Sequence, residues 1–298
     1  MAETAATYVE QLLAEFVDRE DEMARFVRIL EDATRGLMVV WGEGGVGKSS
    51  LQAKMKHELA RRQMRKAEIV WTDTYAHDYL AIMRKLRDDL GVEHFKAFTD
   101  LVNYFTVPEY KLTVNVEGAA KISVLEGAKI EGSTVGDVAA VVIKDLMLVA
   151  PRADKEIPEA ERLTRLTAAF VPCLAAATAQ QPCVVFFDAV EKMTADTERW
   201  VWGELLGRSR DGQLPNIKFV LCGRKEPQLD RTWSRACEVK QLRPLEREHI
   251  VIYLEKRGVV EGREALADLL VVVSKGNLLN LATYVDGYLN VQQARKNG

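Results

Sequence analysis

The chain has 298 residues, enough for one large domain or two smaller ones, and its 48% hydrophobic content can build a sizeable core. Its 41 basic and 44 acidic side chains leave a net charge of -3, which gives no general electrostatic reason to expect nucleic acid or an anionic membrane as a partner. No stretch approaches the roughly 18 apolar residues of a membrane span, and the acidic start of the chain differs from a signal peptide. We therefore expect a globular cytoplasmic protein.

Dispersed cysteines and histidines argue against a structural metal. The four cysteines have no C-x-x-C spacing, and none of the four histidines pairs with a cysteine or carboxylate at metal-ligand spacing. Three of the cysteines lie in or beside apolar runs, which is typical of reduced thiols in the core of a cytosolic protein. The cysteines are Cys173, Cys183, Cys222 and Cys237.

Two short amphipathic helices are predicted ahead of the first strand. Apolar residues recur at helical spacing over 7–16 and again over 21–30. Asp18 is the candidate N-cap of the second helix, because its short carboxylate can accept hydrogen bonds from the N–H groups of a first helical turn.

The chain is organised around residues 41–51, which read Trp-Gly-Glu-Gly-Gly-Val-Gly-Lys-Ser-Ser-Leu. The segment from Gly42 to Ser49 fits the phosphate-binding loop pattern G-x-x-x-x-G-K-[ST] without a mismatch. An apolar run over 36–41 precedes it as a buried strand would, and residues 50–62 follow with helical spacing. Strand, glycine loop and helix are the context that the pattern requires, so nucleotide binding is the firmest prediction.

The residue types of this loop indicate its chemistry. Glycines let the backbone curl until successive N–H groups point at a phosphate, and the following helix adds the positive end of its dipole. Lys48 is expected to reach the β- and γ-phosphates, and the Ser49 hydroxyl to complete the coordination of Mg²⁺. The loop residues predicted to bind the nucleotide are Gly42, Glu43, Gly44, Gly45, Val46, Gly47, Lys48, Ser49 and Ser50.

A change of composition interrupts the core strands after the second one. Residues 67–73 form a second predicted strand, and a helix over 75–90 follows, which Gly91 ends. Between 111 and 142, short β-branched stretches at 112–116, 121–124 and 129–130 alternate with glycines, which favours an inserted hairpin or meander. Its edge is liable to pair with another chain, and a surface flap without a partner is equally consistent.

A second nucleotide-site motif follows a predicted helix over 158–181. Residues 182–188 are an apolar run that ends in Asp188, the Walker B arrangement in which a buried strand delivers a carboxylate beside the phosphates. Asp188 is expected to hold Mg²⁺, and Glu191 to orient or deprotonate the attacking water.

The rest of the chain completes the sheet and then becomes helical. Strands are predicted over 216–224 and 237–242, which makes five core strands in all. Three helices follow, over 246–256, 263–273 and 278–291. We therefore predict a nucleotide-binding domain over 1–242, with the β insertion inside it, and a small helical lid domain over 243–298.

With these motifs the sequence resembles the STAND branch of P-loop ATPases, which includes the NB-ARC and NACHT modules and is related to AAA+ ATPases. Val17-Asp18-Arg19-Glu20 is similar to the family's Val-Gly-Arg-Glu, with Asp18 in the place of glycine. The resemblance assigns Val17 and Arg19 to the base and sugar side of the nucleotide. On the residues alone, an ordinary surface turn before a helix is equally consistent.

Three further positions carry the resemblance. Ala189 stands where the family has glycine after the Walker B aspartate, and Arg224 resembles its sensor arginine, which contacts the γ-phosphate. A solvent-facing arginine at a strand end is the alternative reading of Arg224. Residues 275–279 resemble the G-x-P-L motif, with Leu278 in the place of proline. The candidate catalytic residues are thus Lys48, Asp188, Glu191 and Arg224.

The resemblance implies an α/β fold with a parallel five-stranded core sheet in the order 5-1-4-3-2 and a C-terminal helical subdomain. It further implies a switch that binds ATP or ADP with Mg²⁺, hydrolyses ATP slowly and forms homo-oligomers in the ATP state. An effector or sensor protein is the expected partner, in bacterial defence or cell-death signalling. The alternatives are a cycling AAA+-type motor or loader, and a small-molecule kinase.

Overall fold

The computed structural model describes residues 5–32, 34–71, 78–106, 111–116, 122–125, 143–149 and 157–297. The chain divides into two compact units: Met1–His94 together with Leu174–Gly298, and Phe95–Cys173. Within the described residues, no helix has both the length and the apolar character needed to cross a membrane.

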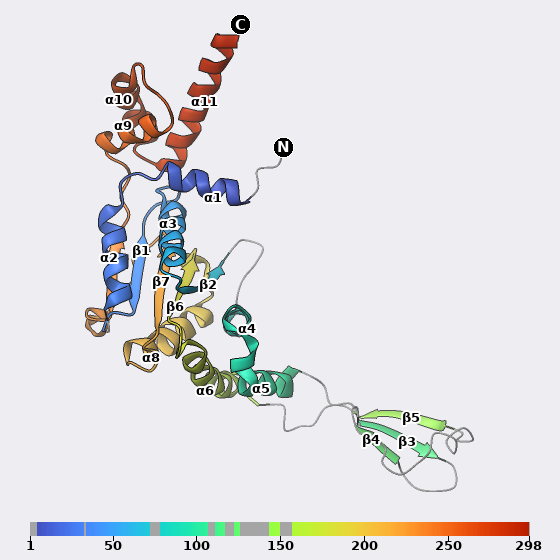
Figure 1. Cartoon of the computed structure of the whole chain (residues 1–298). Helices are drawn as coiled ribbons and strands as arrows, with labels where there is room; N and C mark the ends of the chain where they lie inside the picture. Colours follow the sequence, from blue (N-terminus) through green and yellow to red (C-terminus); the bar gives the residue numbers. More distant parts are fainter. Residues whose placement is uncertain are drawn as a thin grey trace. The chain divides into compact units, whose positions relative to one another are not determined.

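The first unit is built on a five-stranded parallel sheet in the order β2-β6-β7-β1-β8 (Figure 1). Read from β8 to β2, this order confirms the predicted arrangement 5-1-4-3-2. The second strand begins two residues earlier than predicted, and residues 72–77 lie outside the described part of the chain. In chain order the strands are β1 (Leu37–Trp41), β2 (Arg65–Val70), β6 (Cys183–Asp188), β7 (Ile217–Gly223) and β8 (Cys237–Gln241).

The register of the sheet decides where the site lies. Trp41, which ends β1, pairs with Gly223 of β7, and Asp188, which ends β6, pairs with Cys222. Because parallel strands end at the same edge of a sheet, the phosphate loop after β1 and the carboxylate at the end of β6 come out on one side. Two segments that are far apart in the sequence therefore meet at one site.

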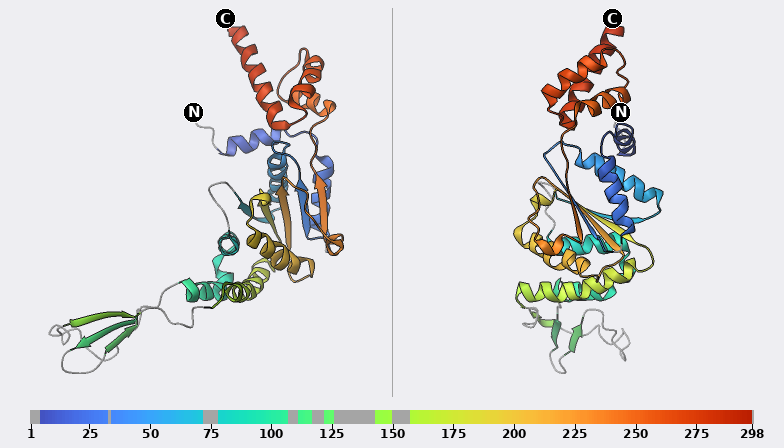
Figure 2. Two further views of the ribbon diagram at one scale, coloured as in Figure 1. Left: turned by 180° about the vertical axis from the view of Figure 1, so that it is seen from behind. Right: turned by 90° about the vertical axis from the view of Figure 1, so that its left-hand side faces the viewer.

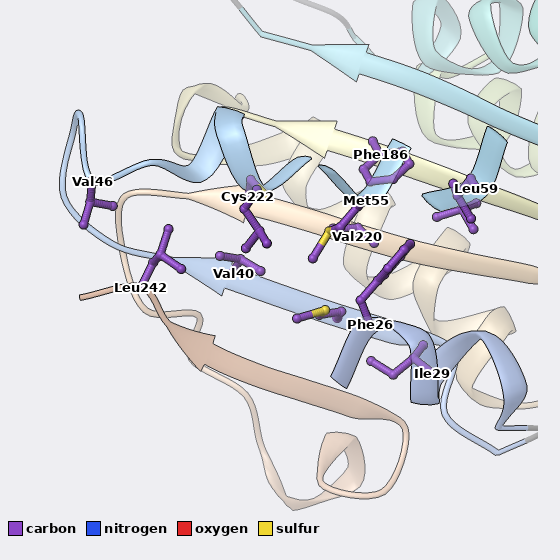
Figure 3. Packing of buried hydrophobic residues seen from close by; sticks show 13 residues of the cluster. Phe26, Ile29, Val40, Val46, Met55, Leu59, Phe186, Val220, Cys222 and Leu242 are labelled. Atoms are coloured by element: carbon purple, nitrogen blue, oxygen red, sulfur yellow. The ribbon is translucent and has the colours of Figure 1, made fainter. Parts of the chain in front are cut away.

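Two helices cover one face of this sheet. The helices α2 (Glu20–Glu31) and α3 (Lys48–Arg61) pack their apolar sides against alternate residues of the strands (Figure 3). Each fully buried aliphatic or aromatic side chain stabilises the fold by about 1.5–3 kcal/mol. The cluster includes Phe26, Ile29, Met38, Val40, Leu51, Met55, Leu59, Val184, Phe186, Val220 and Cys222.

The opposite face of the sheet is apolar as well. Phe187 of β6 stacks on Trp71 and on Phe219 of β7, with ring centroids 5.7 and 6.2 Å apart. A parallel sheet buried on both faces explains the near-continuous apolar runs of its strands. All four cysteines are free and buried, as predicted, and burial raises the pKa values of the Cys183, Cys222 and Cys237 thiols to about 12.

The predicted capping of α2 is wrong. Arg19, not Asp18, occupies the N-cap position, with φ of 131°, and no side chain caps the helix there. Asp18 itself has a left-handed φ of 51°, and its carboxylate accepts a hydrogen bond from the Arg19 guanidinium. The acidic first turn, Glu20 to Glu22, supports the helix start instead through its dipole.

The C-terminal helices form an apolar cluster of their own. They are α9 (Arg247–Lys256), α10 (Arg263–Ser274) and α11 (Leu278–Asn297). The first two lie within one residue of the predicted spans, and α11 ends six residues later than predicted. Figures 1 and 2 show them gathered beside α1 (Ala5–Ala14). Val17 joins their cluster, so the N-terminal segment packs with the end of the chain. The domain boundary at residues 242 and 243 stays a prediction.

The second unit combines helices with a small sheet. Phe170 of α6 (Glu159–Thr178), a helix that ends in the first unit, packs against Phe95 and against Phe98 of α5 (Lys96–Thr106). The predicted β insertion is a three-stranded antiparallel sheet in the order β4-β3-β5. Its strands are β3 (Lys111–Val116), β4 (Ile122–Leu125) and β5 (Ile143–Val149).

The end of the predicted insertion needs correction. The third strand is β5, which begins after residue 142, whereas the stretch predicted at 129–130 lies outside the described residues. The strand β5 forms where it can pair with β3. This partner is distant in sequence, so the spacing of glycines along the chain could not predict it.

Candidate functional site

A cavity of about 780 Å³ lies among the phosphate loop, the N-terminal segment and the C-terminal helices. This volume falls in the range of small-molecule and cofactor sites. Of the predicted loop residues, Gly42, Glu43 and Val46 do not line it. The predicted residues that do are Val17, Arg19, Gly44, Gly45, Gly47, Lys48, Ser49, Ser50, Asp188, Glu191 and Arg224.

Two glycines give the phosphate loop its shape. Gly45 and Gly47 have left-handed φ values of 78° and 105°, and Gly47 forms the N-cap of α3. Side chains other than glycine rarely adopt this conformation. The turn places the first residues of α3, Lys48 and Ser49, in the wall of the cavity, where unpaired helix N–H groups and the helix dipole favour an anion.

Lys48 is held by its own loop. Its Nζ donates hydrogen bonds to the carbonyl oxygens of Gly42 and Glu43, at 2.8 Å each. Burial lowers the pKa of Lys48, while the nearby carboxylates of Glu191 and Asp188 act in the opposite direction. The ammonium therefore stands at the mouth of the loop with two acidic groups close by, where phosphate oxygens can replace the carbonyls as its partners.

Asp188 enters the cavity from the end of β6. Its Oδ1 accepts a hydrogen bond of 2.9 Å from the N–H of Ala189, whose φ of 57° is left-handed. This conformation accounts for a glycine at the same place in the family that the sequence resembles. Burial raises the pKa of Asp188, so the carboxylate gains from a cation beside it.

The donor set fits a magnesium ion that is held mainly by phosphate and water. Ser49 and Asp188 line the same cavity and supply a hydroxyl and a carboxylate, the hard oxygen ligands that Mg²⁺ prefers. In the described part of the chain, no three His, Cys, Asp or Glu side chains gather into a metal cage. Mg²⁺ keeps several waters and is usually bound by one or two protein groups plus substrate phosphates.

Glu191 and Arg224 form an ion pair at this end of the cavity. Glu191 lies on the short 3-10 helix Val190–Lys192, and Arg224 directly follows β7. The Arg224 Nε lies 3.2 Å from Glu191 Oε1, and the Arg224 backbone N–H donates to Oε2 at 3.1 Å. The Glu191 side chain is 15% exposed and that of Arg224 is 63% exposed. Sequence patterns predicted both residues here but not that they pair.

Arg19 helps to form the wall of the cavity. Its buried guanidinium donates to the carbonyl oxygens of Val46, at 3.2 Å, and Arg243, at 2.8 Å. It therefore joins the phosphate loop to the segment that leads into the C-terminal helices. Val17 is buried beside it. A role of Val17 and Arg19 in recognising base and sugar stays a prediction.

The start of α11 is bonded to the phosphate loop, which sequence patterns did not indicate. The Asn277 Nδ2 donates to the carbonyl oxygen of Gly44 at 2.7 Å, and the Leu279 N–H donates to that of Gly45 at 3.0 Å. The resemblance of residues 275–279 to the G-x-P-L motif gave no role to Asn277.

Four polar residues close the far end of the cavity, and we call Glu15, Tyr253, Arg257 and Asp286 the closing network. The Tyr253 hydroxyl donates to Glu15 Oε2 at 3.3 Å, and the Arg257 guanidinium pairs with Glu15 Oε1 at 2.7 Å and with Asp286. Burial raises the pKa of Tyr253, which keeps the hydroxyl protonated as a donor. No motif marks these residues, because they come from three separate segments.

Comparison with known families decides the classification. Residues 15–220 match the family described as the AAA ATPase domain. The chain belongs to this family. It is thus an ATP-binding P-loop AAA ATPase, as the phosphate loop and the sheet order indicate. No curated protein matches the sequence at a significant level.

Solved structures with a similar fold include several ATPases. This ATPase is 14% identical to Cdc6p from Pyrobaculum aerophilum, with a TM-score of 0.51, over 94% of this chain and 62% of that chain. It is 16% identical to a STAND protein with a tetratricopeptide repeat sensor from Pyrococcus horikoshii, with a TM-score of 0.47, over 89% and 29%. AMPPCP-bound DnaA from Aquifex aeolicus is 11% identical, with a TM-score of 0.46, over 95% and 65%. At these identities the likeness concerns the fold alone.

Proposed function

We propose that this AAA ATPase is a nucleotide-controlled switch that binds ATP or ADP, hydrolyses ATP slowly with Mg²⁺, and changes conformation and oligomeric state with the nucleotide. The observation that carries the proposal is the direct bonding of α11 to the phosphate loop, through Asn277 to Gly44 and through Leu279 to Gly45. A nucleotide that reshapes the loop must therefore strain or shift these contacts, which links its presence to the position of the C-terminal helices.

The phosphate end would bind the nucleotide through complementary charge. Lys48 and the N-terminus of α3 face the phosphates, and Ser49 and Asp188 would hold Mg²⁺ beside them. When bound, Mg²⁺ neutralises phosphate charge as it develops during hydrolysis. The apolar part of the cavity, with Val17, is left for the base.

Hydrolysis would use the two groups that form the ion pair. Water attacks the γ-phosphorus, the bond to the bridging oxygen of ADP breaks, and Glu191 orients the water and accepts its proton. Arg224 would turn toward the γ-phosphate oxygens and stabilise their charge. In the paired state each group satisfies the other, so the site is not yet arranged for reaction.

The neutral start of α11 supports slow rather than fast turnover. Asn277, Leu278 and Leu279 contact the loop, and among these described residues there is no cation that would add to the charge stabilisation of the phosphates. A cycling motor or loader is the alternative, and it would need a further cation, for example from a second subunit.

Turnover and mass together test the switch. We expect steady-state phosphate release well below about 1 per second, the lower end of ordinary enzyme turnover. We also expect a larger mass in solution with a non-hydrolysable ATP analogue than with ADP. Fast turnover with the same mass in both nucleotides would contradict the switch and favour the motor.

The cellular role that we propose is bacterial defence or cell-death signalling, with an effector or sensor protein as partner. It is supported by the resemblance of the nucleotide-site motifs to STAND ATPases. A host strain that carries Lys48→Ala in place of the wild-type gene tests it under phage challenge. Equal survival of the two strains would contradict a role in defence.

A further inference from the structure

A buried amide stands beside the candidate metal site without a hydrogen-bond partner for its nitrogen. Gln52 of α3 is 2% exposed, and its Nε2 is buried with no acceptor in hydrogen-bond geometry. Buried polar side-chain atoms in folded proteins nearly always have a partner. The apolar neighbours of Gln52 on the buried side of α3 are Leu51, Met55 and Leu59, so packing alone would be served as well by an apolar residue.

The position of Gln52 connects it with the residues of the nucleotide site. It lies three residues after Ser49 and four after Lys48, a spacing that places all three on one side of the helix. This side meets the strand ends where Asp188 of β6 and Cys222 of β7 are paired neighbours. Burial raises the pKa of Asp188 and of Cys222, and the Gln52 side chain lies close enough to both groups to act in the opposite direction, although its nitrogen is not in hydrogen-bond geometry with either.

We propose that Gln52 is a positioning residue for the metal-binding carboxylate. Its amide nitrogen donates to Asp188 in the nucleotide-bound state and, together with the Ala189 N–H, fixes the carboxylate in the orientation that reaches Mg²⁺ beside Ser49. The inference rests on the proposed function, because it requires that Asp188 binds Mg²⁺ with the nucleotide.

A neutral donor suits this position better than a charged one. A cation directly against Asp188 would repel Mg²⁺, whereas an amide orients the carboxylate without competing for it. The next polar residue on the same side of α3 is Lys56, and its ammonium is paired with Glu68 of β2 and lies over the Phe186 ring. Lys56 also lowers the pKa of Asp188 through its charge, but its ammonium is engaged by Glu68, so Gln52 is the neutral donor beside Asp188.

The test is a titration of Mg²⁺ into the full chain with a fluorescent ADP analogue. Gln52→Leu removes both polar atoms, and Gln52→Glu keeps the length of the side chain but replaces the donor with a charged acceptor. For each variant we expect the Mg²⁺ concentration at half-maximal effect to rise about tenfold or more, the usual loss when a group that orients a metal ligand is removed. Affinity for the analogue in EDTA should stay at the wild-type value.

The control is Met55→Leu, which changes a buried residue of the same helix without touching a polar group, and both quantities should stay unchanged in it. A folded Gln52→Leu or Gln52→Glu chain with a wild-type or lower Mg²⁺ requirement would overturn the proposal. So would a loss of affinity in EDTA that accounts for the whole effect, since that marks a structural role. If neither variant folds, Gln52→Asn, which keeps a shortened amide, is measured against the same outcomes. Failure of the proposed function would show differently, as a wild-type chain that binds no nucleotide or ignores Mg²⁺.

Discussion

The two ends of the cavity are built in different ways. At the phosphate end, Lys48 is held by two carbonyl oxygens of its own loop at 2.8 Å, so the contacts are local in sequence. At the other end, Arg257 joins Glu15, 242 residues away, and Asp286 of α11. The loop therefore holds Lys48 by itself, although α11 also bonds to the loop, whereas the closing network exists only while the C-terminal helices stay packed beside Glu15.

This difference indicates which end of the cavity can move. Partly exposed ion pairs contribute modestly to stability, and their geometry depends on distant elements staying in place. The phosphate end should bind and react with little rearrangement beyond the Glu191 and Arg224 pair and the contact of its loop with α11. Opening and closing should then be controlled at the closing network and at the contact of α11 with the loop.

The largest effect is expected at the phosphate end, in turnover. Glu191→Gln removes the carboxylate that would take the proton, and we expect hydrolysis to fall by about 10²–10⁴-fold with nucleotide affinity intact. Phosphate release and an equilibrium titration measure the two quantities. Glu198→Gln, an exposed position on α7 (Ala195–Trp200), is the control. Wild-type turnover in Glu191→Gln would move the catalytic role to another residue.

At the far end, the closing network should matter for stability. Arg257→Met leaves Glu15 and Asp286 without their cation, and we expect the free energy of unfolding to fall by about 2 kcal/mol, less than for a fully buried pair because Asp286 is 55% exposed. Denaturant unfolding measures it. Arg247→Met, which removes two more exposed ion pairs between α9 and α10, should cost less. Equal losses in the two variants would show that the closing network is an ordinary surface feature.

A matched pair of glycines can separate loop strain from contact with α11. Gly45→Ala introduces a side chain at a φ of 78°, where its Cβ would lie 2.6 Å from Asn277 Oδ1. Gly212→Ala has nearly the same φ, 77°, with open space around it. Both should lose about 1 kcal/mol of stability from the backbone, and Gly45→Ala should lose about 1 kcal/mol more from the contact. Identical losses would mean that α11 does not press on the loop.

The smallest effect is expected for the amide that joins α11 to the loop. Asn277→Ala removes the hydrogen bond to the Gly44 carbonyl, which a bound nucleotide would strain, so we expect nucleotide binding to tighten by roughly fivefold, which corresponds to about 1 kcal/mol. An equilibrium titration measures it, with Asn280→Ala, an exposed neighbour on α11, as control. Unchanged affinity in both variants would leave the link between α11 and the nucleotide without support.

The phosphate end can be predicted from the sequence because short spacing encodes it. The residues from Gly42 to Ser49 act through backbone turns and a helix start, and both depend on residue types within one loop. The position of Asp188 can be predicted as well, because an apolar run that ends in an acidic residue indicates a buried strand whose last residue lies at the edge of the sheet. The sheet order came with the family resemblance, which the AAA ATPase match bears out.

The rest depends on contacts between distant residues. The closing network pairs Glu15 with Arg257, and no pattern along the chain relates two such positions. The prediction that Asp18 caps α2 was wrong for a similar reason. The Arg19 side chain bonds to two distant carbonyl oxygens, and these hydrogen bonds outweigh the local preference for Asp18 as N-cap. The proposed role of Gln52 could not be predicted from the sequence either, because it depends on which strand ends lie beside this side chain.

Equilibrium titration of a fluorescent ATP analogue with Mg²⁺ into the wild-type chain and into Lys48→Ala tests the central claim most directly. Lys48→Ala removes the partly buried cation of the loop, and we expect nucleotide affinity to fall by about two orders of magnitude while the fold is kept. Lys66→Ala, an exposed lysine of β2, should bind as wild type does. Equal affinity in Lys48→Ala and the wild type would contradict the phosphate loop as the nucleotide site.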